Sequence, residues 1–314
     1  MHKIMKKDTK RVADEKMMRL ATVFSVGVAL IIISVKLVAW VMTDSLSLLS
    51  SLVDSVLDVL ASLISFFAVR YSLQPADEDH RFGHGKAEDI AAFAQSAFIA
   101  GSGAFIFIEA ISRFITPHKI EHEAVGIAVM VFSSILTLAL ISYQRHVIKH
   151  TNSSAIKADS LHYHTDLLVN ALVILSFIVV MVWDVPIVDP ILAFVISAYI
   201  FMSAWKVGRG AFDKLMDKEF DDSERKRIMD VILSHPEVKG MHDLRTRSSG
   251  IKPFIQFHLE LDREISLVKA HEISDVVEME LIEIFPNAEV LIHQDIEGDA
   301  RLEVGRVVPL TNGE

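Results

Sequence analysis

The hydrophobic residues of this chain form long continuous stretches up to about residue 212 and only short, interrupted stretches after it. A helix needs about 20 predominantly apolar residues to cross a bilayer, so each long stretch predicts a transmembrane helix. The stretches cover residues 18–42, 46–71, 88–115, 124–143, 158–183 and 188–211. The pattern thus predicts an all-α membrane domain of six helices over residues 18–212, preceded by a basic segment over residues 1–17.

Shorter elements follow from Asp213 onward, with apolar residues spaced at the period of a helix or of a strand. We predict a helix over 222–233, strands over 240–246 and 254–261, a helix over 267–285 and a strand over 289–293. This α-β-β-α-β order predicts a small α+β domain over residues 213–298 and a loose tail over 299–314. Because a domain this small gains stability by association, we expect dimerisation through it.

Lysine and arginine near the ends of the predicted helices indicate the orientation of the chain, because cytoplasmic segments are enriched in both. One side of the membrane holds Lys3, Lys6, Lys7, Lys10, Arg11, Lys16, Arg19, Arg81, Lys86, Arg145, Lys149 and Lys157. The other side holds little beyond Arg113 and Lys119. Both termini are therefore expected in the cytoplasm.

The composition combines the properties of a membrane protein and a soluble one, with 51% hydrophobic and 23% charged residues. The formal net charge of -10 argues against a nucleic-acid partner. The chain has no cysteine, which excludes disulfides and thiolate ligands. Any transition-metal site must therefore use histidine, aspartate and glutamate.

Two pairs of ionisable residues interrupt the apolar stretches. Asp54 and Asp58 are four residues apart, as are His162 and Asp166, so each pair lies on one face of a helix. An ionised aspartate near the bilayer centre costs roughly 2.5 to 3.5 kcal/mol, and a bound cation would offset that cost. Carboxylates and imidazoles are zinc ligands. These residues predict a metal site inside the membrane; the alternative is a polar contact between helices or part of a proton relay.

The loop between the second and third predicted spans holds a second group of ligand-type residues. Asp77, His80 and His84 lie there, and Gly83 and Gly85 let the backbone bend so that the three converge on an ion. The alternative is a solvated loop, in which acids and histidines are common without a metal.

A third group of ligand-type residues falls on the predicted elements of the C-terminal domain. His293 and Asp295 share one face if the last strand extends through them, and His258 lies on a neighbouring strand. His242 lies on another strand or its edge, and His271 lies on the following helix. Either these side chains converge on a metal or each is exposed or hydrogen-bonded separately. His146, His150 and His164 have no assigned role.

Three segments together resemble the motifs of the cation diffusion facilitator family, specifically its bacterial ferrous-iron and zinc efflux type. They are Ser51-Leu-Val-Asp-Ser-Val-Leu-Asp58, His80-Arg-Phe-Gly-His-Gly-Lys-Ala-Glu88 and Ala158-Asp-Ser-Leu-His-Tyr-His-Thr-Asp166. The likeness runs from the first span to His293-Gln294-Asp295, and the longer basic N-terminus before Arg19 departs from it.

The resemblance implies a homodimeric antiporter that moves a divalent cation out of the cytoplasm in exchange for protons, with a metallochaperone-like cytoplasmic domain. It implies a transport site at Asp54, Asp58, His162 and Asp166 and a loop site at Asp77, His80 and His84. It also implies a paired-ion site at the dimer interface, formed by His242, His258, His271, His293 and Asp295.

Histidine among the ligands suits Zn²⁺ and Cd²⁺ better than Mg²⁺ or Ca²⁺, which prefer all-oxygen shells, and Fe²⁺ is a further candidate. Together with this ligand preference, the resemblance implies a proton-coupled zinc exporter in the inner membrane of a bacterium. The alternative is a membrane metal sensor that binds ions without moving them. A passive channel would need a continuous hydrophilic path, and an enzyme is disfavoured because four protein ligands leave no open position on the metal.

Overall fold

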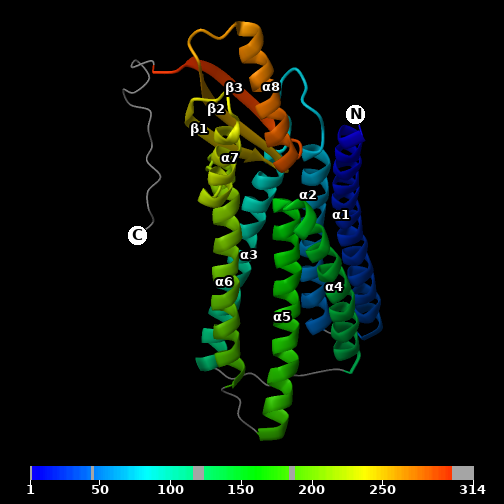
Figure 1. The fold of residues 1–314 in the computed structure, drawn as a ribbon. Coiled ribbons are helices and arrows are strands. Elements are labelled where there is room, and N and C mark those ends of the chain that lie inside the picture. Colours follow the sequence, from blue (N-terminus) through cyan, green and yellow to red (C-terminus); the bar gives the residue numbers. More distant parts are fainter. Residues whose placement is uncertain (1, 44–45, 116–123, 184–187, 299–314) are drawn as a thin grey trace. The chain divides into compact units, whose positions relative to one another are not determined.

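Six long helices make up the first part of the chain in the computed structural model, which describes residues 2–43, 46–115, 124–183 and 188–298 (Figure 1). They are α1 His2–Thr43, α2 Leu46–Ser72, α3 Lys86–Ile115, α4 Ala124–Thr151, α5 Ser154–Trp183 and α6 Val188–Leu215. Each predicted span falls on one of these helices. Lys119 and the predicted tail over 299–314 lie outside the described residues.

Five of these helices, within the described residues, contain a segment apolar and long enough to cross a membrane. The segments are Val12–Met42, Ser51–Ser72, Lys86–Ser112, Ile127–Thr151 and Pro190–Leu215. The remaining predicted span lies on α5, where the side chains of 173–174 and 176–183 are outside the described part of the structure. Helix α1 continues without a break from the basic N-terminal segment into the first span.

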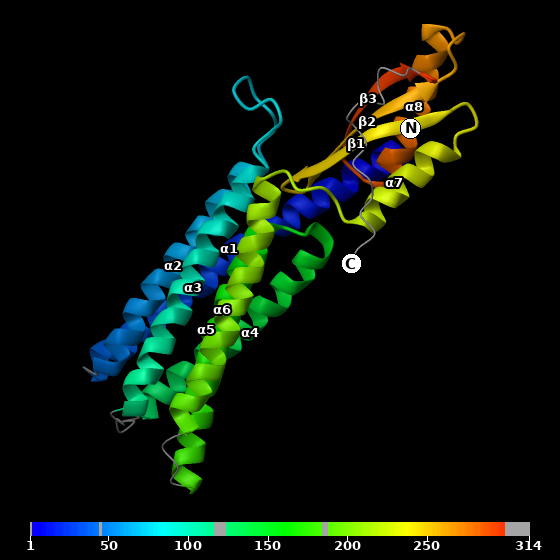
Figure 2. The same ribbon diagram turned by 90° about the vertical axis from the view of Figure 1, so that its left-hand side faces the viewer.

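The helices of the membrane part pack around α5, which contacts α2, α3 and α4. Both views show α2 to α6 running side by side (Figures 1 and 2). Tyr163 of α5 is buried between Val28 of α1 and Leu140 of α4. Large apolar side chains such as Phe105 and Trp205 are exposed, as expected of a surface that faces lipid.

The residues from Asp213 onward belong to a second compact unit, separate from Val12–Phe212. Its elements are α7 Asp222–Ser234, β1 Gly240–Ser249, β2 Lys252–Leu261, α8 Leu267–Ile284 and β3 Glu289–Ile296. The sheet order is β1-β2-β3, with β1 antiparallel and β3 parallel to β2. A parallel pair needs a crossover connection, and α8 supplies it. The predicted α-β-β-α-β fold is confirmed.

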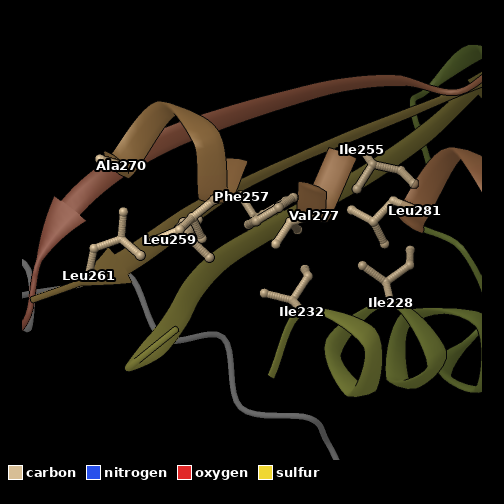
Figure 3. Close-up of a cluster of buried hydrophobic side chains, with 10 residues drawn as sticks. Ile228, Ile232, Ile255, Phe257, Leu259, Leu261, Ala270, Val277 and Leu281 are labelled. Carbon is tan, nitrogen blue, oxygen red and sulfur yellow. The ribbon is translucent and has the colours of Figure 1, made fainter. Parts of the chain in front are cut away.

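The core of this domain lies between one face of the sheet and the two helices (Figure 3). Every second residue of β2 is buried in it, from Ile255 through Phe257 and Leu259 to Leu261. Ile232 of α7 and Val277 of α8 close the core from the other side. Because side chains alternate along a strand, His258 and Glu260 lie on the opposite face of the sheet.

All three strands are longer than the hydrophobic pattern predicted, and the differences in β1 and β3 affect the candidate ligands. Strand β3 continues to Ile296, so Asp295 lies within the strand rather than after it. Strand β1 extends to Ser249 and contains a register shift between His242 and Arg245, where Asp243 has a φ of 50°. Such a bulge cannot be read from alternation, because it inserts a residue into the two-residue period.

Candidate metal centres

Asp58 of α2 and His162 and Asp166 of α5 converge within the membrane part of the chain. One ligand atom from each lies within 4.8 Å of the others. His162 Nε2 is 3.0 Å from Asp58 Oδ1 and 3.7 Å from Asp166 Oδ2. The side chain of His162 is 8% exposed, that of Asp58 19% and that of Asp166 37%, so the imidazole is the most buried ligand of the cluster. Two carboxylates and an imidazole so arranged are suited to hold a divalent cation.

Asp54 lies on α2 one turn from this cluster, but its side chain is exposed and it is not one of the three converging residues. Lys36 of α1 approaches the same region, with Nζ donating to the Ser51 carbonyl at 3.1 Å and to Ser55 Oγ at 2.6 Å. Lys36 also interacts electrostatically with Asp54 and with both aspartates of the cluster. No role was predicted for Lys36 from the sequence, although a lysine within a membrane-spanning stretch indicates a functional site.

A buried hydrogen-bond network lies one helical turn from the imidazole of the cluster. Asp159 is 1% exposed, and its Oδ2 accepts hydrogen bonds from Ser25 Oγ at 2.7 Å and Gln144 Nε2 at 2.6 Å. Ser62 Oγ lies 3.0 Å from Ser25 Oγ and 2.7 Å from Tyr163 Oη. The network joins α1, α2, α4 and α5, and thereby fixes the segment of α5 that carries the cluster.

Asp77, His80 and His84 converge in the loop between α2 and α3, with one ligand atom from each within 4.8 Å of the others. His84 Nε2 is 3.2 Å from Asp77 Oδ2, and His80 Nδ1 is 3.4 Å from Asp77 Oδ1. Gly83 has a φ of 82°, a conformation that favours glycine and turns the chain between the two histidines. The His84 ring packs edge-on against Tyr71, and its side chain is buried.

The backbone of the loop holds Asp77 in its ionised form. Asp77 Oδ1 accepts hydrogen bonds from the backbone N–H of His80 at 2.6 Å and of Asp79 at 3.1 Å. The bond from His80, supported by the nearby imidazoles, lowers the pKa of Asp77 below its ordinary value. A carboxylate ligand is therefore available in this loop at lower pH than an ordinary aspartate would allow.

The sheet of the C-terminal domain brings His242, His258 and Asp295 together on the face opposite the core. His258 is the register partner of both His242 on β1 and His293 on β3, so three imidazoles form a row across the strands. His258 Nδ1 is 2.6 Å from Asp295 Oδ2, and His242 Nε2 is 3.4 Å from the same oxygen. We call His242, His258 and Asp295 the domain cluster.

The other two predicted ligands of this domain lie outside the domain cluster. His293 is at its margin, with Nε2 3.3 Å from Asp295 Oδ1 and a side chain that is 66% exposed. His271 lies on α8, is exposed, and is 3.6 Å from Asp275. An open pocket of about 300 Å³ lies on the cluster's face of the sheet. Its lining comprises Asp243, Arg245, Gln256, Phe257, His258, Leu291 and His293.

Two carboxylates that were not among the predicted ligands border the domain cluster. Glu260 Oε1 is 2.8 Å from His242 Nδ1, and Asp243 Oδ2 is 3.8 Å from His258 Nε2. Glu260 follows His258 by two residues on a strand, and this spacing places both on one face of the sheet. The same spacing could have identified Glu260 as a neighbour of the cluster from the sequence alone. Nothing in the spacing indicates Asp243, because its position depends on the bulge in β1.

Comparison with known families accounts for nearly the whole chain. Residues 22–216 match the cation efflux transmembrane domain, and residues 220–297 match the cytoplasmic domain of cation efflux proteins. The chain belongs to the cation diffusion facilitator family. The predicted resemblance is thus confirmed, and with it a multi-pass membrane protein of a cation efflux transporter family.

Relatives in this family are similar over most of their length. The cation-efflux pump FieF of Serratia proteamaculans is 45% identical over 280 residues, which cover 89% of this chain and 93% of the relative. FieF of Shewanella oneidensis is 44% identical over 88% of this chain and 93% of its own. Protein p34 of Rickettsia rickettsii is 43% identical over 89% of this chain and 92% of its own.

Proposed function

We propose that this protein exports zinc from the cytoplasm in exchange for protons, with Asp58, His162 and Asp166 as the core of its transport site. The observation that supports this most directly is the convergence of three metal-type ligands within the membrane part of the chain. Asp54 is the proposed fourth ligand, because it lies one turn from Asp58 on the same side of α2.

Exchange follows from competition between metal ion and proton for the same lone pairs. Zinc binding requires a neutral imidazole and ionised carboxylates, so loading releases protons and acidification favours metal release. The site must also bind more weakly than a structural zinc site, whose binding free energy reaches roughly 10 to 16 kcal/mol. Exposure to each side of the membrane in turn then completes a transport cycle. Cd²⁺ and Fe²⁺ are further candidate substrates with compatible ligand preferences.

The remaining features fit a regulated homodimer in a bacterial inner membrane, with both termini in the cytoplasm and no enzymatic activity. Zinc at the domain cluster, together with His271 and His293, would join the C-terminal domains of two protomers and bias the membrane helices by binding one arrangement more tightly. The loop cluster of Asp77, His80 and His84 would be a second cytoplasmic binding site. Distance measurements between the two C-terminal domains, with and without zinc, test the regulatory part.

The transport proposal is tested by zinc uptake into proteoliposomes under an imposed pH gradient. Asp58→Asn and His162→Gln remove ligands with little change in size, and each should abolish gradient-driven uptake. Ser134→Ala is a matched control, because Ser134 donates only to the Met130 carbonyl of its own helix, at 2.8 Å. Uptake retained in either ligand variant would refute the site. Zinc binding without uptake in the unmodified protein would favour a metal sensor.

A further inference from the structure

We propose that Glu260 is a positioning residue of the domain cluster, and that it holds the His242 imidazole with the Nε2 lone pair directed at the metal. This inference rests on the proposed zinc binding at His242, His258 and Asp295. Glu260 would not contact the metal itself. It would act by fixing the orientation of the His242 imidazole and the nitrogen that carries its proton.

The contact between the two side chains determines which nitrogen carries the proton. His242 Nδ1 is 2.8 Å from Glu260 Oε1. An ionised carboxylate only accepts hydrogen bonds, so His242 donates from Nδ1. In a neutral imidazole the other nitrogen, Nε2, is then unprotonated and carries the lone pair that a metal requires.

The surroundings of His242 Nε2 fit an atom that binds a metal better than one that is satisfied by a hydrogen bond within the protein. This atom is buried and has no hydrogen-bond partner among the described residues. It lies 3.4 Å from Asp295 Oδ2, and in the tautomer argued above both atoms carry lone pairs and neither carries a proton. A cation between them would turn this unfavourable pair into a favourable one. Histidines that bind metals commonly donate their second N–H to a carboxylate in this way.

The backbone opposite Glu260 is adapted to the same contact. Gly240 is the register partner of Glu260 across β1 and β2. A Cβ added to Gly240 would lie 2.7 Å from Glu260 Oε2 and 3.1 Å from its Cδ. The clashing atoms are the far end of a flexible side chain, so a methyl group there would displace the carboxylate and leave the strands paired. Gly240→Ala therefore disturbs the contact without removing the acid.

The test measures zinc affinity by equilibrium titration of the full-length protein in detergent micelles. Asp58→Ala and His84→Ala are present throughout, so that zinc binding reports on the C-terminal domain. Loss of an outer carboxylate partner typically weakens metal binding about 10- to 100-fold, which is the effect expected of Glu260→Ala. Gly240→Ala should weaken binding in the same direction. Glu260→Gln should restore most of the affinity, because the amide oxygen still accepts from His242 Nδ1.

Two controls separate positioning from a loss of folding. Glu264→Ala removes an exposed acid from the turn after β2 and should leave zinc affinity unchanged. The zinc-free melting temperature of Glu260→Ala is measured beside that of Glu264→Ala, and a cooperative zinc-free unfolding transition in both shows that weaker binding is not a loss of folding. If Glu260→Ala and Gly240→Ala bind zinc within about twofold of Glu264→Ala, the inference is overturned. If Glu260→Gln binds as weakly as Glu260→Ala, the hydrogen-bond account is overturned.

His242→Ala distinguishes failure of this inference from failure of the site it rests on. That variant should abolish zinc binding in the same background. If it leaves binding unchanged, the domain cluster binds no zinc, and both the proposed zinc binding there and the role of Glu260 are refuted. The proposed transport site is tested separately by the flux measurement.

Discussion

The buried network around Asp159 should contribute measurably to the stability of the membrane part, and Gln144 offers the cleanest way to measure it. Gln144 Nε2 donates to Asp159 Oδ2 at 2.6 Å, and both side chains are almost fully buried. A hydrogen bond to a charged group contributes about 1.5 to 3 kcal/mol, against about 0.5 to 1.5 kcal/mol for one between neutral groups. If Asp159 is ionised, Gln144→Leu, which keeps much of the side-chain volume, should lower the free energy of unfolding by the larger amount.

A double-mutant cycle isolates the charged hydrogen bond from other effects of the leucine. Reversible unfolding in mixed micelles of a mild detergent and dodecyl sulfate gives the free energies. In an Asp159→Asn background, the cost of Gln144→Leu should fall to the neutral range of about 0.5 to 1.5 kcal/mol. Ser134→Ala on the same helix is the control, because it removes only a hydroxyl bonded within α4.

Two results would refute this reasoning. Gln144→Leu could cost no more than Ser134→Ala, which would mean that Asp159 gains nothing from its donor. The cost could also be the same with aspartate and asparagine at position 159, which would mean that the charge is irrelevant. Because Asp159 lies one turn before His162 on α5, the first result would also weaken the network as an explanation for the placement of the proposed transport site.

Three further changes have defined outcomes. Lys36→Met should tighten zinc binding and slow its release, because it removes a positive charge near the proposed transport site; zinc titration and flux on one preparation test both effects. Asp77→Asn should weaken zinc binding by the loop at pH 7, because it removes a carboxylate ligand whose pKa is lowered by the His80 backbone N–H; unchanged loop affinity in a zinc titration would contradict this. Leu259→Ala in the domain core should cost about 2 to 5 kcal/mol of stability by thermal unfolding, whereas Leu267→Ala at an exposed position should cost less than about 0.5 kcal/mol.

Local spacing predicted the elements and the pairs of ligands that share an element. The four-residue spacing of His162 and Asp166 placed both on one side of α5, where they lie within 3.7 Å. The two-residue spacing of His293 and Asp295 likewise placed both on one face of β3. In each case the helix or strand period alone decides which side chains are neighbours.

Contacts between elements could not be predicted in the same way. The bond between Glu260 and His242 depends on the register of β1 against β2, and that register shifts at Asp243. The network at Asp159 depends on how four helices are rotated about their axes, which an apolar stretch does not specify. Asp54 shows that spacing within one helix is not sufficient either. Its four-residue spacing from Asp58 predicts a ligand pair, but among the described residues only Asp58 joins the cluster.

The charges around the proposed transport site offer a reason why these residue types lie together in a membrane. Moving an isolated divalent ion into a low-dielectric region is very costly, and the cost falls as the net charge of the site approaches zero. When ionised, Asp54, Asp58 and Asp166 supply three negative charges, and Lys36 interacts with all three. With a charged Lys36, a neutral His162 and a bound Zn²⁺, the group would have no net charge. Without the metal, three ionised carboxylates beside Lys36 would leave an excess of two negative charges, which protons on the same residues can offset. The proposed exchange of zinc for protons is therefore consistent with this charge balance as well as with the shared lone pairs of the ligands.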